Sequence, residues 1–383
     1  MGVGAIELLK DLVSIKSENP GCYEYEIADF ISHLLKKHDI EYEVIYSGNK
    51  RVNIVGFLYG ESDHVLILNG HLDTKPAKGN WRTDPYTPVI KNNKLYGLGA
   101  SDMKGGLAAM LSAVIRSKGK KLKGTINFQF VADEEMNSEF GMKYLVKNGY
   151  IKNGDFAIVG EPTNLKVATR SLGNLWLVIK VRGRKAHAGM YWEGISAIDR
   201  SIEIIDEIKS SIRKYRYKND PEISNFPNVN VGYINGGFHP GTVPDYCEFS
   251  IDIRFRSEQE REIFKDMVNK TVTRILFKYD CECEIEPFGG GDMFAWDLAS
   301  FENIDRYLDL IDQSYYAIIK QAAQKCVFLG GSDASSLVYD LGIPTVIIGP
   351  GSLKQAHNNN EWVFIDEVVN ASKIYEEIIS RWE

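Results

Sequence analysis

Residues 65–73 read V-L-I-L-N-G-H-L-D, a mostly apolar run followed at once by a histidine and an aspartate. Two later stretches repeat this arrangement: T-I-N-F-Q-F-V-A-D-E-E at 125–135 and F-A-I-V-G-E at 156–161. Near-continuous apolar runs of this length are typical of strands covered on both faces of a parallel sheet. Residues 105–116 have a helical pattern between them. Together these stretches predict an α/β fold with a doubly wound, mostly parallel sheet.

The alternation of helix and strand continues on both sides of this core. Helical periodicity is found at 4–18, 24–38 and 366–382, and strand patterns at 51–58 and 344–349. Between them, the segment N-L-W-L-V-I-K-V-R-G (174–183) alternates instead, as an open antiparallel strand does. It is followed by helical patterns at 194–214 and 257–277 and by strand patterns at 228–235, 245–256 and 280–286.

This second pattern has the order β-α-β-β-α-β, which predicts an inserted ferredoxin-like domain. A chain of 383 residues is also long enough for more than one core. We therefore expect one α/β domain in two parts, 1–167 and 287–383, interrupted by an inserted domain at 168–286.

The composition and charge of the chain argue against nucleic-acid-binding and membrane proteins. A formal charge of −7 argues against a nucleic-acid partner, and no apolar run approaches the ~20 residues that span a bilayer. The N-terminal pattern is an amphipathic helix rather than a secretory signal. Five cysteines without C-x-x-C spacing indicate free thiols in a reducing compartment. We expect a cytoplasmic protein that binds neither nucleic acid nor membrane.

Histidines and carboxylates gather where the predicted strands end. Ligands of open α/β sheets bind outside the carboxyl ends of the strands, so separated segments would deliver these side chains to one edge. The candidates are His71 and Asp73 after the first strand, Glu134 and Glu135 after the second, Glu161 after the third, Asp102 in a glycine-rich turn, and His357 after strand 344–349.

Each of these features alone has an ordinary structural explanation. Asp102 could be a helix N-cap, the glutamate pair a solvated helix start, and each histidine a surface residue. Their shared position at one edge favours a functional site. Several carboxylates within ~6 Å of one another would repel unless a cation neutralised them.

The donor set predicts the kind of site. Imidazole and carboxylate without thiolate suit zinc, with cobalt or manganese as alternatives. One carboxylate can bridge two divalent ions ~3.5–4 Å apart, the arrangement used for hydrolysis. Of Glu134 and Glu135, one can ligate while its neighbour holds the attacking water. Asp73 can accept the second N–H of His71 and so orient that ring.

Several runs of the sequence resemble one known family across nearly the whole chain and in family order. They are G-H-L-D-T-K-P, W-R-T-D-P-Y-T-P-V-I-K-N-N-K-L-Y-G-L-G-A-S-D-M-K-G-G, A-D-E-E, G-E-P-T, G-G-S-D-A, G-I-P-T-V-I-I-G-P-G and A-H-N-N-N-E-W. The chain resembles the acetylornithine deacetylase / succinyl-diaminopimelate desuccinylase / aminoacylase group of dinuclear metallohydrolases.

The resemblance implies a role for each candidate. Asp102 would bridge the ions, His71 and Glu161 would complete one, and Glu135 and His357 the other. Glu134 would be the general base and Asp73 the partner of His71.

The resemblance also implies functional residues in the inserted domain, which would be a lid and dimerisation domain. His187 in R-K-A-H-A-G would polarise the scissile carbonyl, often from the partner subunit of a homodimer. Arg254 would grip a substrate carboxylate, with Asn230 near it. Ordinary structural roles are the alternatives: His187 could be a surface histidine, and Arg254 could form an ion pair across a strand face.

The implied activity is hydrolysis of the amide bond of an N-acyl amino acid, with metal-bound hydroxide as nucleophile. A carboxypeptidase or dipeptidase with the same machinery is the alternative, and a non-catalytic metal-binding homologue is a third. The chain departs from the family where Leu98 replaces a frequent arginine and Lys75 a small apolar residue; Lys75 could alter the charge of the pocket. Glu161, rather than aspartate, resembles the deacetylase–desuccinylase side of the family.

Overall fold

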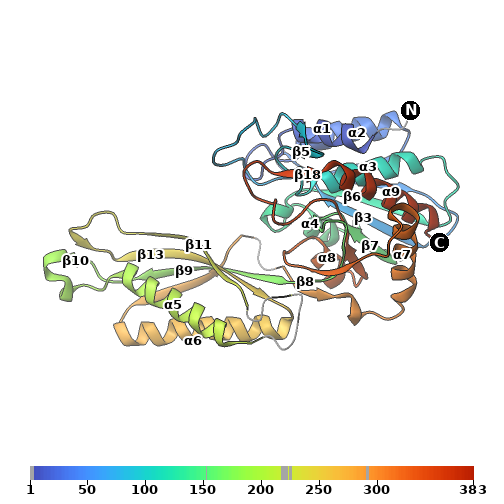
Figure 1. Ribbon diagram of the computed structural model, residues 1–383. Coiled ribbons are helices and arrows are strands. Elements are labelled where there is room, and N and C mark those ends of the chain that lie inside the picture. Colours follow the sequence, from blue (N-terminus) through green and yellow to red (C-terminus); the bar gives the residue numbers. More distant parts are fainter. Residues whose placement is uncertain (1–3, 152, 217–222, 224–226, 290–292) are drawn as a thin grey trace. The chain divides into compact units, whose positions relative to one another are not determined.

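The computed structural model describes residues 4–151, 153–216, 223, 227–289 and 293–383. Contacts divide the chain into two compact units. The first comprises the chain up to Arg170 together with Asp297–Glu383, and the second comprises Ser171–Trp296. The chain enters the second unit at Ser171, the last residue of β8 (Val167–Ser171), and leaves it within β15 (Trp296–Asp297) (Figure 1).

The first unit is built on a sheet that runs β1-β2-β6-β3-β7-β17-β8. The four central strands β6, β3, β7 and β17 are parallel, as expected, whereas β1, β2 and β8 are antiparallel to their neighbours. The strands are β1 (Glu41–Gly48), β2 (Arg51–Leu58), β3 (Val65–His71), β6 (Thr125–Val131), β7 (Phe156–Val159), β8 (Val167–Ser171) and β17 (Thr345–Ile347), with β16 (Lys325–Phe328) paired to β8.

Two groups of helices pack in this unit (Figure 1). Helices α1, α3, α7 and α9 contact one another as one group, whereas α8 packs on β7 and β17 with α4 beside it. The apolar runs are buried as predicted, since every residue of β6 and β7 is buried. The helices are α1 (Ala5–Ser14), α2 (Tyr25–Lys37), α3 (Lys104–Ser117), α4 (Met142–Lys147), α7 (Asp305–Ile319), α8 (Ala334–Tyr339) and α9 (Ile365–Arg381).

Close packing of α3 fixes the backbone next to the predicted site. A Cβ at Gly106 would lie 2.1 Å from the carbonyl oxygen of Gly160, so only glycine lets this helix approach the turn that carries Glu161. A small sheet of β4 (Val89–Lys91), β5 (Lys94–Tyr96) and β18 (Trp362–Phe364) completes the unit.

The second unit has the predicted β-α-β-β-α-β order. Its four strands form one antiparallel sheet in the order β11-β13-β9-β14, and α5 and α6 pack on it over a shared apolar core. The elements are β9 (Gly173–Arg182), α5 (Ala197–Lys214), β11 (Val229–Gly236), β13 (Tyr246–Phe255), α6 (Glu258–Tyr279) and β14 (Glu282–Pro287), with the small pair β10 (Ala186–His187) and β12 (Thr242–Val243).

The boundaries between the units differ from the predicted 167/168 and 286/287. The first falls after Arg170, because β8 still pairs with β17 of the first unit. The second falls after Trp296, because Met293 bridges to Asn174 and Ala295 packs in the core of the second unit.

Two expectations from composition can be compared with the structure. The five cysteines are free thiols, as predicted. Among the described residues, no helix is both long enough and apolar enough to cross a membrane.

Candidate metal centre

Parallel strand pairing brings the predicted ligands together. His71 is the last residue of β3 and lies opposite Val131, the last residue of β6. Glu134 and Glu135 open a short 3-10 helix directly after β6, and Glu161 follows β7 on the other side of β3. These three strand ends are therefore neighbours at one sheet edge, as the sequence predicted.

Six side chains form two groups whose potential ligand atoms lie within 4.8 Å of one another. The first group is His71, Glu134 and Glu161, and the second is Asp102, Glu135 and His357. In the first, His71 Nε2 lies 3.5 Å from Glu161 Oε1 and 3.9 Å from Glu134 Oε2. In the second, His357 Nε2 lies 2.9 Å from Glu135 Oε2.

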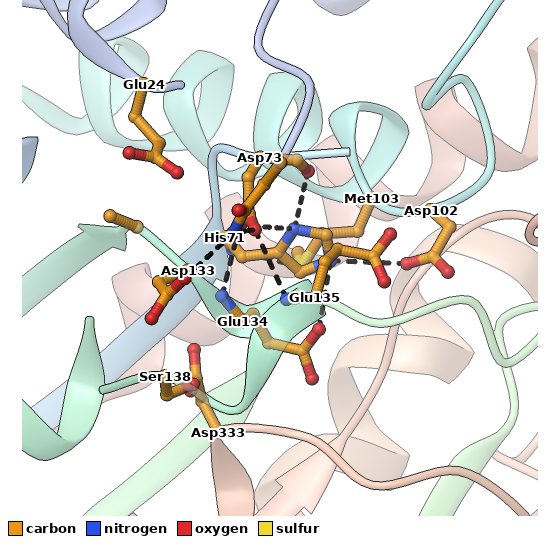
Figure 2. Close-up of polar contacts among 12 residues, drawn as sticks. Glu24, His71, Asp73, Asp102, Met103, Asp133, Glu134, Glu135, Ser138 and Asp333 are labelled. Atoms are coloured by element: carbon orange, nitrogen blue, oxygen red, sulfur yellow. Dashed lines mark hydrogen bonds and ion pairs between the residues drawn. The ribbon is translucent and has the colours of Figure 1, made fainter. Parts of the chain in front are cut away.

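Asp102 connects the two groups through its two carboxylate oxygens. Oδ1 lies 3.2 Å from His71 Nε2, and Oδ2 lies 3.5 Å from His357 Nε2. Figure 2 shows the Asp102 carboxylate directed toward the His71 ring, with Glu134 and Glu135 beside it. One carboxylate thus faces both histidines, which is the geometry that a bridging ligand requires.

Glu361 holds the turn that presents Asp102, a role that was not predicted from the sequence. Its buried carboxylate accepts the backbone N–H groups of Gly99, Ser101 and Asp102 at 2.7–2.9 Å. Burial and the Asp102 charge raise the pKa of Glu361 to about 8, against the effect of these donors. A glutamate in a polar loop gives no local sign of this role, because its partners lie some 260 residues away.

Asp73 contacts His71 differently from the prediction. The nearest acceptor for His71 Nδ1 is the backbone carbonyl of Asp73 at 2.9 Å, whereas the Asp73 carboxylate lies at 3.5 Å. That carboxylate instead accepts the backbone N–H groups of Glu134 and Glu135 at 3.1 and 3.2 Å. Residue 73 therefore orients the ring mainly through its main chain, while its side chain fixes the glutamate pair (Figure 2).

Asn19 and Arg51 support Asp73 from outside the predicted site. The amide of Asn19 donates to Asp73 Oδ2 and Asp133 Oδ1, both at 2.8 Å, and its oxygen accepts from Arg51 at 2.8 Å. Arg51 also pairs with the buried Glu24 at 2.6 Å. Sequence reasoning missed this network because its members come from four segments that only the fold brings together.

Electrostatics shows why cations fit this site. Burial raises the pKa values of Glu134 and Glu161 well above those of free glutamate, with neighbouring carboxylates adding to the effect. Burial opposes charge on His71, but Glu161, Asp102 and Asp73 outweigh it and raise its pKa well above the usual value. The protein alone therefore supplies too little positive charge to keep Glu134 and Glu161 ionised, and bound cations would supply the rest.

One oxygen adds direct evidence for a ligand. Glu161 Oε1 is buried and has no hydrogen-bond partner among the described residues, although it faces the His71 ring at 3.5 Å. Buried carboxylate oxygens are normally paired, so this atom has the character of a cation ligand. The donor set and this oxygen both fit divalent metal ions.

The three candidates of the inserted domain lie in the second unit. His187 is exposed at the end of β10, and its Nδ1 accepts the N–H of Gly189 at 3.1 Å. Arg254 donates through Nε and Nη2 to Asp252 on the same strand at 3.0 and 2.8 Å. Asn230 on β11 lies opposite Asp252 in the strand register. Asp252 thus contacts Arg254 and is the register partner of Asn230.

Comparison with known proteins adds independent findings. The family model described as Peptidase family M20/M25/M40 matches residues 67–381. The chain is 31% identical to an acetylornithine deacetylase of Proteus mirabilis over 85% of this chain and 81% of the relative. It is also 31% identical to an N-formyl-4-amino-5-aminomethyl-2-methylpyrimidine deformylase of Bacillus subtilis, over 98% of this chain and 94% of the relative.

A solved structure has a similar fold at lower identity. An M20 family metallo-carboxypeptidase from Sulfolobus solfataricus superposes with a TM-score of 0.80 and 18% identity, over 99% of both chains. At this identity the likeness concerns the fold alone.

Proposed function

The chain belongs to peptidase family M20/M25/M40, and we propose on that basis that it hydrolyses the amide bond of an N-acyl amino acid at a two-ion centre. Family membership makes it a metal-dependent amidohydrolase or peptidase, in agreement with the sequence analysis. The 31% identical deacetylase and deformylase both bear names for removal of a small acyl group, which supports the acyl substrate class.

The observation that carries the proposal is the position of Asp102. Its two oxygens face His71 and His357 at 3.2 and 3.5 Å, so one carboxylate serves both ligand groups. With Asp102 as the bridge, His71 and Glu161 would hold one ion and Glu135 and His357 the other. The all-oxygen-and-nitrogen donor set supports zinc, with cobalt or manganese as alternatives.

Bound ions would polarise the scissile carbonyl and lower the pKa of the attacking water. The chain itself supplies the proton transfer. Glu134 is buried, and its backbone N–H is fixed by Asp73 Oδ1 at 3.1 Å, so its carboxylate stays at the cluster. In this role a Glu134 oxygen takes the proton of the water and returns it to the nitrogen of the leaving amine.

Glu134 also lies in the same group as His71 and Glu161, so a ligand role is the alternative to a base role. Glu134→Gln distinguishes them, because glutamine keeps the size of the side chain but cannot accept the proton. The proposal predicts loss of turnover of at least about 10²-fold with unchanged metal content. Loss of metal, or full activity, would contradict it. Glu139→Gln, at an exposed position nearby, is the matched control.

Substrate recognition is proposed for the second unit. His187 would polarise the carbonyl, and Arg254 with Asn230 would bind the substrate carboxylate. Arg254 supports this role because a guanidinium matches carboxylate geometry, and its Nε and Nη2 already bind the Asp252 carboxylate in this way. Arg254→Lys should raise KM for carboxylate-bearing substrates with little change in kcat.

A carboxypeptidase or dipeptidase remains the second candidate, because the family model that matches residues 67–381 describes a peptidase family. Acetyl-, formyl- and succinyl-amino acids tested beside dipeptides and longer peptides would separate the two activities. Preference for the acyl compounds supports the proposal. Turnover of peptides alone would replace it, and no turnover of any compound by the metal-loaded chain would favour a non-catalytic metal-binding protein.

We also propose that the chain forms a homodimer through its second unit. Large apolar side chains are exposed there, including Trp192 (72%) and Phe238 (75%), which a monomer would leave in water. Sedimentation of the wild type beside a Trp192→Ser, Phe238→Ser double variant tests this. A wild-type monomer, or a double variant that stays dimeric, would contradict the proposal.

A further inference from the structure

Lys75 places a positive charge against one of the two ligand groups. Its ammonium donates to the backbone carbonyl of Glu135 and lies 3.4 Å from Glu135 Oε2. Its backbone N–H donates to the other carboxylate oxygen, Oε1, at 3.2 Å. Both oxygens of Glu135 therefore contact residue 75.

The same Oε2 also faces the histidine of this ligand group. It lies 2.9 Å from His357 Nε2, so a cation held by Glu135 and His357 would share this oxygen with the Lys75 ammonium. In the described part of the chain, the ion pair of Lys75 is with Glu135. Among the described residues, Glu161 has no ion pair with a lysine or arginine; its Oε1 lies 3.5 Å from His71 Nε2.

The two groups also differ in access to solvent. The difference lies at the histidines: the His71 side chain is 0% exposed and that of His357 is 51% exposed, whereas Glu161 and Glu135 are similarly buried at 4% and 5%. Water screens the attraction between a ligand and its ion, so the His357 group begins with less electrostatic stabilisation. A nearby ammonium then adds direct repulsion of a divalent ion.

We propose that Lys75 makes the Glu135–His357 position the weaker of the two cation positions and so tunes how readily its ion is exchanged. This inference rests on the two-ion centre of the proposed function. It concerns Lys75 as a residue that sets metal affinity, acting through Glu135, rather than as a participant in the reaction.

Metal titration of the chelator-treated chain tests the inference. Calorimetry with Zn²⁺ would be run on the wild type, Lys75→Met and Lys78→Met. Methionine keeps much of the length of the lysine stem, and the backbone N–H bond of residue 75 stays. Lys78→Met removes the same formal charge three residues along the chain, so it controls for net charge. His357→Ala identifies which binding event belongs to the Glu135–His357 position.

The expected wild-type result is two events with unequal affinity, the weaker one absent in His357→Ala. Lys75→Met should tighten that weaker event at least about tenfold, because repulsion of a dication at this range is strong in a partly buried site. The tighter event should change less than about threefold, and Lys78→Met should leave both within that range. A wild type that binds one ion, with a second gained in Lys75→Met, would also support the inference.

Equal affinities in the wild type, or a weaker event that is unchanged or weakened in Lys75→Met, would overturn it. The outcome is separable from that of the proposed function. Two ions and active hydrolysis without an effect of Lys75→Met would refute only the inference. A tightened second event in a chain that hydrolyses no amide would refute only the function. One ion in both chains would refute both.

Discussion

Replacement of Asn19 by alanine tests the buried network behind the metal centre. Asn19 is 1% exposed and makes three hydrogen bonds of 2.8 Å, all to charged groups: Asp73, Asp133 and Arg51. Asn53 is a matched control. It is 0% exposed and also makes three hydrogen bonds, but all to neutral groups: Ser47, the carbonyl of Phe140 and the N–H of Ala132.

The difference between the two variants can be worked out from these contacts. Hydrogen bonds to charged groups contribute ~1.5–3 kcal/mol each and neutral ones ~0.5–1.5 kcal/mol. Three bonds of each kind therefore differ by ~4 kcal/mol when the central values, ~2.25 and ~1 kcal/mol, are used. Asn19→Ala should lower the free energy of opening of the first unit by at least about 2 kcal/mol more than Asn53→Ala does.

Hydrogen exchange followed by mass spectrometry measures this quantity within one unit of the chain. Peptides covering β3 and β6 would report the free energy of opening, with chelator present so that metal binding does not contribute. Equal losses in the two variants, or a larger loss for Asn53→Ala, would refute the assignment of Asn19 as the support of Asp73.

Three further predictions follow from the site and its surroundings. Burial alone would lower the pKa of His357. The hydrogen bond to Glu135 and the negative charges of Glu135 and Asp102 outweigh burial and raise this pKa to about 9. A metal ion must displace the proton of His357. The affinity of the chain for Zn²⁺ should therefore rise with pH by up to about tenfold per pH unit and level off above pH ~9. Competition with a chelator measures this affinity, and an affinity that falls with rising pH would contradict the prediction. Gly349→Ala would place a Cβ 2.2 Å from Gly160 O and 2.5 Å from Glu161 O, and should destabilise the first unit by ~3 kcal/mol. Thermal unfolding beside Gly4→Ala, where nothing lies within 4 Å, checks this, and equal unfolding temperatures would refute it. Asn19→Ala should also weaken metal binding ~10-fold through Asp73, whereas Asn53→Ala should not; equal Zn²⁺ affinities in the two variants would contradict the link.

The strands that carry the ligands could be predicted because each is a local apolar run followed by a polar residue. His71, Glu135 and Glu161 needed only the rule that parallel strands end at one edge. The antiparallel strands at the edge of the sheet were harder to predict. Strand β1 begins with an alternation, E-Y-E-V, that breaks at the following I-Y, and the sequence analysis predicted no strand there.

The supporting residues could not be predicted in the same way. Glu361, Asn19 and Arg51 act through contacts with segments far away in the sequence, and none lies in a pattern specific to such a role. The role of Asp73 was predicted only in part, because whether its carbonyl or its carboxylate meets the ring depends on backbone geometry at the end of β3.

The metal content of Asp102→Asn tests the central claim most directly. The substitution preserves shape but removes the charge from the one carboxylate that faces both His71 and His357. Calorimetry and elemental analysis should find two Zn²⁺ per wild-type chain, one in His357→Ala, and affinity for both ions reduced at least about tenfold in Asp102→Asn. Two ions held by Asp102→Asn with wild-type affinity would contradict the bridged centre.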